Sequence, residues 1–254
     1  MTTKIKRIIA KLIIKARYLK SVYQIRKLKN TYNGKRCFIV GNGPSLRLED
    51  LEKLKEDYCF GTHQIYRIFD KTDWRPNFYC AQDQVLINQS FEQINNLKVE
   101  KKFIASPINS WSKKVIKNSI LTKIIIKDFY PDLPEFSEDV SKGIYEGFTV
   151  TYMCLQLAVY MGFKEIYLLG VDHHYNISRL PNGEIIVDNS AKNHFIEGYD
   201  LPVVPQTSKS TLAYESAKVY ADKHNIKIYN ATRGGSLEVF ERVLFDELFE
   251  GERG

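Results

Sequence analysis

Residues 37–45 read Cys37-Phe38-Ile39-Val40-Gly41-Asn42-Gly43-Pro44-Ser45, a short apolar run that leads into a glycine-rich turn. Where a parallel strand ends in such a turn, backbone N–H groups are exposed at the edge of the sheet where nucleotides and phosphates bind. We expect Gly41 and Gly43 to adopt positive φ and to approach a ligand closely. Asn42 is expected to offer its amide to a base or ribose, and Ser45 to cap the next helix or contact a phosphate. The turn can also serve packing alone, because Leu46 stands where a full G-x-G-x-x-G fingerprint has its third glycine.

Short apolar runs alternate with helical patterns along the rest of the chain. Strands are predicted near residues 36–41, 58–62, 77–81, 101–106, 122–126, 165–169 and 226–230, and helices near 48–56, 84–97, 149–161, 211–224 and 236–249. This alternation predicts an α/β, Rossmann-like fold with a mostly parallel sheet and helices on both faces. Residues 36–254 are predicted to form one nucleotide-binding catalytic domain. The long connections 127–147 and 171–210 are expected at the carboxyl ends of the strands, the second as a mobile lid.

The positive charge of the chain is concentrated at its N-terminus. The 254 residues carry a net charge of +7, yet twelve Lys or Arg and no acidic residue lie in residues 1–36, which leaves 25 basic and 30 acidic residues in the remainder. Ile5, Ile8, Ile9, Leu12 and Ile13 begin an apolar pattern with helical spacing and basic residues between. Residues 1–35 are therefore predicted to form a basic amphipathic helix that binds an anionic membrane surface. The alternative is a solvated helix that packs on the domain or on a partner subunit.

Several chemistries are disfavoured by what the sequence lacks. Cys37, Cys59, Cys80 and Cys154 form no C-x-x-C pair, so they are predicted to be buried thiols in a reducing compartment rather than zinc ligands or disulfides. No P-loop, H-E-x-x-H or G-x-S-x-G motif occurs, which disfavours P-loop kinases, zincin proteases and the usual α/β-hydrolases. No apolar run is long enough to span a bilayer, and no basic face of the body indicates binding to nucleic acid.

Polar residues suited to chemistry follow several predicted strands. Asp172, His173 and His174 come directly after the strand near 165–169, where they suit acid–base work or phosphate contact. A metal site there is disfavoured, because adjacent histidines rarely bind one ion, and no metal is predicted. The other candidates are Thr149 as an N-cap at an anion-binding helix start, His194 as a loop base, Arg233 for a carboxylate or phosphate, and Asp83 with His63 and Gln64 for a ribose. Capping, packing or solvation alone would also explain each of them.

These motifs together resemble those of two related families. The Gly-Asn-Gly-Pro-Ser turn, Tyr152-Met153-Cys154 and the stretch 162–172 resemble bacterial sialyltransferases of glycosyltransferase family 42, and Ile226-Lys227-Ile228-Tyr229 resembles their last core strand. The runs 69–76 and 230–235 look closer still to domain of unknown function 115. That family includes motility-associated glycosyltransferase factors, which glycosylate flagellin with nonulosonic acids, and a 6-hydroxymethylpterin diphosphokinase.

The resemblance implies roles for individual residues. Gly41, Asn42, Gly43 and Ser45 would hold the CMP part of a CMP-sugar. Thr149 lies near the donor-binding position. His174 stands about where the sialyltransferases have a tyrosine that contacts the donor phosphate. His63 and Asp83 stand about where they have asparagines. Their catalytic histidine belongs to the lid, where this chain has Thr207 or Ser208 at the matching position and His194 fourteen residues before Ser208. His194, or else His174, is therefore the predicted base.

The function expected from these observations is transfer of a nonulosonic or similar acidic sugar from a CMP-sugar to a glycan or glycolipid acceptor, in polysaccharide biosynthesis. The Gly41–Ser45 turn, Thr149 and the second histidine would stabilise the leaving phosphate, and Arg233 would pair with the donor carboxylate or an acceptor anion. The predicted location is the cytoplasmic face of the plasma membrane, and a homo-oligomer is left open. The alternatives are Mg²⁺-dependent diphosphate transfer from ATP, with Asp83 and Asp172 as metal ligands, and a non-catalytic scaffold.

Overall fold

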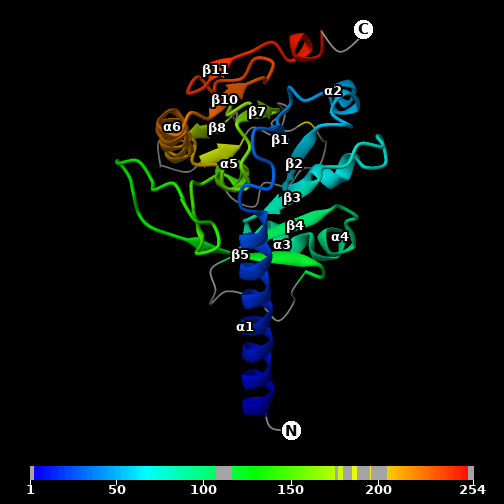
Figure 1. The fold of residues 1–254 in the computed structure, drawn as a ribbon, viewed down its shortest axis with the longest axis vertical. Coiled ribbons are helices and arrows are strands. Elements are labelled where there is room, and N and C mark those ends of the chain that lie inside the picture. The colour runs from blue at the N-terminus through cyan, green and yellow to red at the C-terminus, as the bar shows by residue number, and fades with distance from the viewer. Residues whose placement is uncertain are drawn as a thin grey trace.

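The fold is described from a computed structural model, drawn in Figure 1. The structure describes residues 3–106, 116–174, 177–179, 185–187, 195 and 205–250.

Nine strands form one sheet within this part of the chain, and all their pairings are parallel. The spatial order is β11-β10-β7-β1-β2-β3-β4-β5-β6. The bounds are β1 Arg36–Val40, β2 Tyr58–Thr62, β3 Phe78–Ala81, β4 Lys101–Ser106, β5 Ser119–Ile125, β6 Ile144–Tyr145, β7 Glu165–Leu169, β10 Lys227–Asn230 and β11 Glu241–Arg242. The predicted α/β, Rossmann-like parallel sheet is confirmed.

The order of the strands reverses at the centre of the sheet. From β1 the chain adds β2 to β6 on one side, then returns to place β7 against the other side of β1, with β10 and β11 beyond. The carboxyl ends of β1 and β7 are thus neighbours, and the connections that leave them diverge to opposite sides. Such a switch point is where open α/β sheets bind their ligands.

The helices cover both faces of the sheet. They are α1 Thr3–Leu28, α2 Leu48–Lys53, η1 His63–Ile68, α3 Gln84–Gln89, α4 Phe91–Asn96, α5 Val150–Met161, α6 Thr207–Lys223 and η3 Phe245–Phe249. The helix predicted over 84–97 is two helices separated at Ser90, and α6 begins four residues before its predicted start. The helix predicted over 236–249 is wrong: that segment contains strand β11 and the short helix η3.

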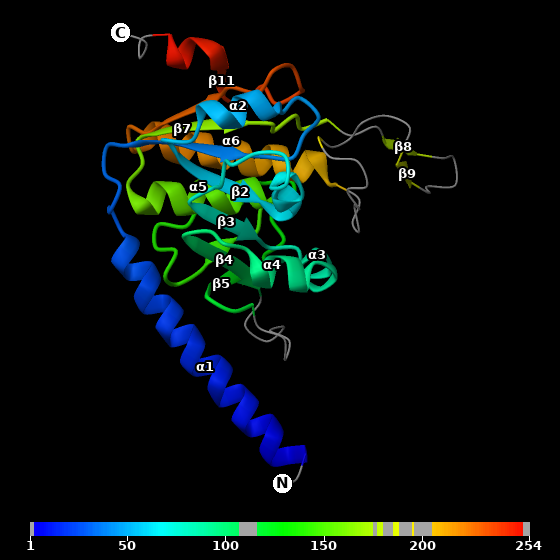
Figure 2. The ribbon, with the colours of Figure 1, turned by 90° about the vertical axis from the view of Figure 1, so that its right-hand side faces the viewer.

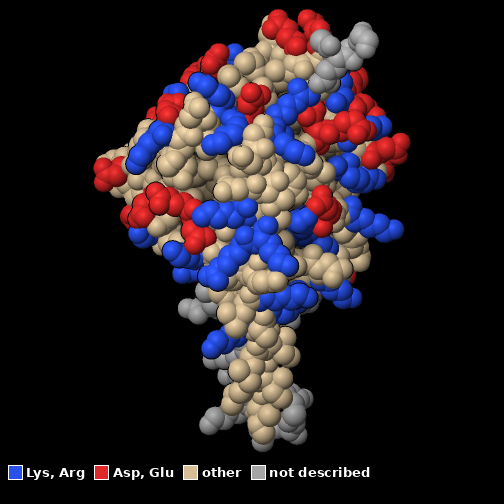
Figure 3. Space-filling view, viewed as in Figure 1, with Lys and Arg blue, Asp and Glu red and all other residues tan. Residues whose placement is uncertain are grey.

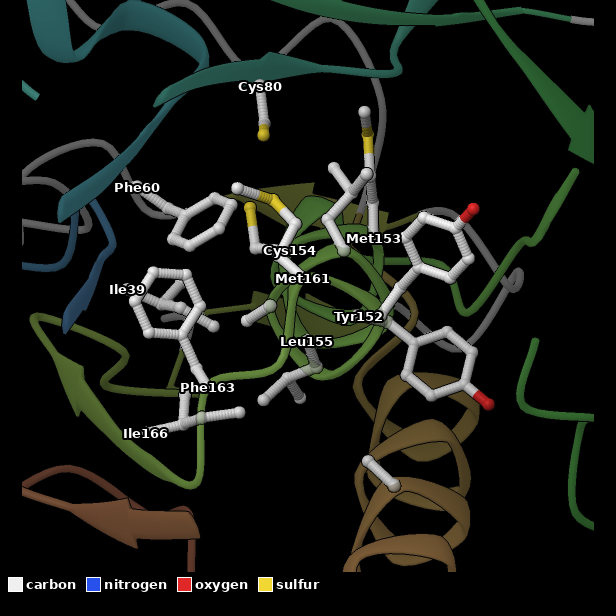
Figure 4. Packing of buried hydrophobic residues seen from close by; sticks show 14 of the residues in the cluster. Ile39, Phe60, Cys80, Tyr152, Met153, Cys154, Leu155, Met161, Phe163 and Ile166 are labelled. Atoms are coloured by element: carbon white, nitrogen blue, oxygen red, sulfur yellow. The ribbon is translucent and has the colours of Figure 1, made fainter. Parts of the chain in front are cut away.

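The core lies in two layers, one on each face of the sheet. Along β1, Cys37 and Ile39 point into the first layer, while Phe38 and Val40 point into the second. The first layer is built around α5, which contacts β1, β2, β3 and α6 and is apolar around its circumference because it is buried between them (Figure 4). The second layer includes Leu51 of α2 and Ile94 of α4. All four cysteines are buried free thiols, as predicted.

Helix α1 has one end on the body and one end beyond it (Figure 1). Ser21, Ile25 and Leu28 are buried, and Ser21 Oγ accepts the N–H of Leu121 in β5 at 2.9 Å. Arg17 donates to the carbonyl oxygen of Ile116 at 2.9 Å. Leu121 lies outside the stretch where β5 pairs with β6, so α1 supplies a hydrogen-bond partner to this edge of the strand. Among the described helices, none combines the length and apolar content required to cross a bilayer. The domain boundary near residue 35 stays a prediction.

An aromatic cluster in the first layer gives a test of the core. Phe163 is fully buried and lies against Tyr32 (ring centroids 4.9 Å apart), Tyr58, Phe60 and Phe78. We expect Phe163→Ala to lower the free energy of unfolding by about 3–5 kcal/mol, because it removes buried apolar surface and leaves a cavity. Urea denaturation measures this, with Val219→Ala on the exposed face of α6 as the control. A loss below about 1 kcal/mol for Phe163→Ala would contradict this packing.

Candidate functional site

The turn after β1 and the loop after β7 approach each other without space for a side chain. Gly41 donates its N–H to the carbonyl oxygen of Leu169, and Gly43 donates to that of Gly170, both at 2.8 Å. A Cβ on Gly43 would lie 1.8 Å from Asp172 Oδ2, and one on Gly41 would lie 2.3 Å from the oxygen of Gly170. The expectation of positive φ is wrong, since neither glycine has it. Glycine is required here by the closeness of the neighbouring loop.

Asp172 joins three loops at the switch point. Its carboxylate accepts the Ser45 hydroxyl at 2.7 Å and the Ser45 N–H at 3.3 Å, and its carbonyl oxygen accepts the N–H of Ser236 at 2.7 Å. Burial raises the pKa of this carboxyl above its ordinary value, while the hydrogen bonds from Ser45 oppose the rise. Ser45 does not cap the next helix, as its side chain binds Asp172 and the N-cap of α2 is Arg47.

Unsatisfied acceptors lie beside this junction. The Asn42 amide nitrogen donates to the carbonyl oxygen and the hydroxyl of Thr62, at 3.0 and 3.1 Å, which fixes the orientation of the amide. Its oxygen Oδ1 is then buried with no hydrogen-bond partner in the described part of the chain, and the same holds for Gln82 Oε1 directly after β3. A buried acceptor without a partner costs about 1–3 kcal/mol. Asn42 follows β1 and Gln82 follows β3, with β2 between them. Buried acceptors without a partner at this edge of the sheet are typical of a site that awaits a donor from a ligand.

Strained backbone gathers at the same edge of the sheet. Outside asparagine and glycine, positive φ occurs in the described residues at His63 (46°), Phe148 (56°) and His173 (52°). His63 follows β2, Phe148 lies between β6 and α5, and His173 follows β7. Left-handed φ is costly for side chains of this size and is retained chiefly where function or tight packing imposes it.

A polar group links the loop after β7 to the starts of α5 and α6. His173 Nε2 lies 2.8 Å from the Thr211 hydroxyl, and the ring contacts Tyr214 edge to face, with centroids 5.4 Å apart. Burial lowers the pKa of His173 below its ordinary 6.5, so the ring is neutral at physiological pH. The Tyr214 hydroxyl lies 3.4 Å from Thr149 Oγ1, which accepts the N–H of Thr151 and caps α5 as predicted.

The remaining predicted site residues are not brought together with this polar group in the described part of the chain. His174 is exposed on the loop after β7, and His194 lies outside the described residues. Asp83 accepts the N–H of Leu86 at 2.9 Å and caps α3. Arg233 pairs with Asp50 and Asp246, so a role toward a donor carboxylate stays a prediction that requires these ion pairs to open. Within the described residues, no three His, Cys, Asp or Glu side chains are placed to hold a metal.

The described parts of the predicted lid lie at the carboxyl edge. Strands β8 (Ile177–Arg179) and β9 (Ile185–Val187) pair antiparallel and project beyond that edge in Figure 2. Phe195 donates its N–H to the carbonyl oxygen of Asn42 at 2.9 Å, and its ring packs against the second core layer. One point of the 171–210 connection is therefore bonded to the glycine turn.

A cavity of about 340 Å³ opens after β5 and β6, and Phe129, Tyr130, Glu135, Tyr145 and Glu146 are among the residues that line it. Burial raises the pKa of the Glu146 carboxyl, and Lys209 opposes this rise. Phe129 contacts Phe148, the residue before Thr149, with ring centroids 5.8 Å apart. The contact between Phe129 and Phe148 thus connects the cavity wall to the start of α5.

Sequence reasoning missed three of these residues, Gln82, Thr211 and Tyr214, whereas His173 belongs to the group expected to suit acid–base work or phosphate contact. The i, i+3 spacing of Thr211 and Tyr214 on one face of α6 was an available signal. Gln82 directly follows a buried strand, as Asn42 nearly does.

The parallel sheet and its switch point define a Rossmann-like α/β protein. A family model described as "6-hydroxymethylpterin diphosphokinase MptE-like" matches residues 11–178, about two thirds of the chain. The chain therefore belongs to the MptE-like family. The matched region contains both the Gly41–Ser45 turn and the Asp172 loop, and membership indicates a transferase-type activity. No curated protein matches the chain.

The contact between Gly43 and Asp172 gives a direct prediction. Gly43→Ala should destabilise the protein by more than about 2 kcal/mol, because the added Cβ overlaps the Asp172 carboxylate. Gly34→Ala is the control, since an added Cβ meets nothing within 4 Å and only its φ of +76° carries a cost of about 1 kcal/mol. Urea denaturation compares the two. Equal losses would show that the close approach is absent.

The buried carboxyl of Asp172 predicts a pH dependence. Its folded-state pKa is raised, so the folded state holds more protons than the unfolded state between the ordinary pKa of 3.8 and the raised value. The contribution of Asp172 to stability therefore falls as pH rises through this window. The stability of Asp172→Asn relative to the native protein should increase over the same interval. Denaturation from pH 3.8 to neutrality tests this, and a difference that does not change with pH would contradict it.

Proposed function

We propose that the protein transfers a nonulosonic or similar acidic sugar from a CMP-sugar to a glycan or glycolipid acceptor. The observation that carries the proposal is the convergence at one switch point of the glycine turn, the Asp172 carboxylate and the amide of Asn42, whose buried Oδ1 has no hydrogen-bond partner among the described residues. The transferase-type activity indicated by the family is compatible with this chemistry.

The donor would lie across the carboxyl ends of β1 and β7. Asn42 Oδ1, which follows β1, can accept a hydrogen bond, and the exocyclic amino group of cytosine donates one. Asp172 suits a ribose hydroxyl better than a phosphate, because two negative charges repel. The phosphate would then lie toward the N-terminus of α5, where Thr149 caps the helix and the helix dipole favours an anion.

Transfer would proceed by one displacement. The acceptor hydroxyl oxygen attacks the anomeric carbon, the bond from that carbon to the phosphate oxygen breaks, and CMP leaves with the bonding electron pair. The hydroxyl proton passes to His194 or His174. The acceptor would occupy the cavity beside β5 and β6, where Phe129 and Tyr130 offer flat apolar surface and Glu146 can accept from sugar hydroxyls.

A second candidate is diphosphate transfer from ATP to a small alcohol, which the family description favours. That chemistry requires Mg²⁺ held by carboxylates. Asp83 and Asp172 are the candidates, but Asp83 caps α3 and Asp172 is bonded to Ser45, so both would have to exchange partners. A non-catalytic scaffold with a vestigial nucleotide pocket is the remaining alternative.

Nucleotide binding separates these functions. Thermal denaturation with CMP, CDP, UDP, ADP or ATP, each with and without Mg²⁺, measures stabilisation, which reaches about 2.7 kcal/mol at a hundredfold excess over Kd. We expect CMP to stabilise the protein without metal. A shift only with ATP and Mg²⁺ would favour diphosphate transfer, and no shift with any nucleotide would favour the scaffold.

The base is tested by histidine variants. If His174 is the base, His174→Ala should lower kcat by about 10²–10⁴ and leave CMP binding unchanged. His224→Ala is the matched control, since His224 is exposed at the opposite end of α6. Near-normal turnover of His174→Ala would exclude this role and leave His194, whose alanine variant is measured in parallel.

A further inference from the structure

Helix α1 carries apolar side chains on two separate faces. Ser21, Ile25 and Leu28 form the face that is buried against the body. A second apolar face of the helix is exposed. It is formed by Ile5, Ile8, Ile9, Leu12, Ile13, Leu19 and Tyr23, which are 40–61% exposed, and we name it the α1 stripe.

The α1 stripe is continuous along the helix. At 100° per residue all its members fall on one side of the helix, and from Ile5 to Tyr23 they extend about 27 Å at 1.5 Å per residue. At 100° per residue this side is opposite to that of Ser21 and Ile25. Figure 3 shows the front of the projecting helix as a largely uncharged surface, with Lys and Arg gathered where the helix meets the body.

Charge distinguishes the possible partners of this surface. No acidic residue occurs before Glu49, whereas twelve basic residues lie in residues 1–36. The exposed Lys15 and Lys20 lie along the two edges of the stripe. A second copy of α1 would bring like charges together, but an anionic lipid surface would bind the lysines while its acyl region accepts the apolar side chains.

We propose that the α1 stripe docks on an anionic lipid surface, with the helix in the plane of the interface. The inner face of the plasma membrane carries such lipids. Docking would hold the carboxyl edge of the sheet near membrane-borne acceptors, yet the binding itself does not depend on the proposed chemistry.

The test is sedimentation of the full chain with vesicles. Vesicles of phosphatidylcholine alone are compared with vesicles that contain about 30% phosphatidylglycerol. We expect binding to the anionic vesicles, and we expect Leu12→Glu with Leu19→Glu to weaken it by about tenfold or more. Leu12 and Leu19 are 61% and 59% exposed, away from the body, so the fold should persist, and circular dichroism checks this.

The matched control is Val219→Glu with Leu244→Glu, which alters two residues of similar exposure, 60% and 66%, by the same charge outside α1. It should bind as the native chain does. Equal loss in both double variants, or no preference for anionic vesicles, would overturn the proposal. A dimer in light scattering that Leu12→Glu with Leu19→Glu dissociates would also overturn it, because a second copy would then cover the stripe.

Discussion

The contact between Asp172 and the turn after β1 holds the functional edge of the sheet together. Residues 127 apart in sequence meet there, and they meet only because Gly43 has no side chain. The constraint extends to the loop after β10, since a Cβ on Gly235 would lie 2.6 Å from the Asp172 carbonyl oxygen. The loops after β1, β7 and β10 therefore take their positions from one carboxyl residue. Burial of the Asp172 carboxylate is unfavourable, and this unfavourable burial lies at the proposed ligand site.

The same edge departs from what stability alone would favour. His63, Phe148 and His173 are strained, and the oxygens of Asn42 and Gln82 have no described partner. The central strands β1, β2, β3 and β7 are regular and mostly apolar. Proteins commonly depart from local rules where a ligand or a reaction requires it, so this distribution supports the candidate site independently of any motif.

The buried strands could be predicted from sequence because most of them are short, continuous apolar runs between turn residues. Segment 236–249 could not, since Leu237 and Phe240 pack in one core layer and Phe245 in the other as the chain passes the sheet edge. The apolar residues of this segment have helix-like spacing only because they pack into two different core layers. At the site, the edge of the sheet was predictable from where strands end. The bond between Ser45 and Asp172 was not, because local patterns carry no information on contacts over such separations.

Helix α1 also affects how the chain assembles. Ser21 satisfies the N–H of Leu121, a partner that is synthesised 100 residues later. At typical rates of about 5–20 residues per second, this delay is on the order of 5–20 seconds. During that interval the helix has neither β5 nor the core to cover its inner face. The nascent chain thus presents apolar surface on both sides of α1, and an early encounter with a lipid surface or a chaperone would protect it until the sheet is complete.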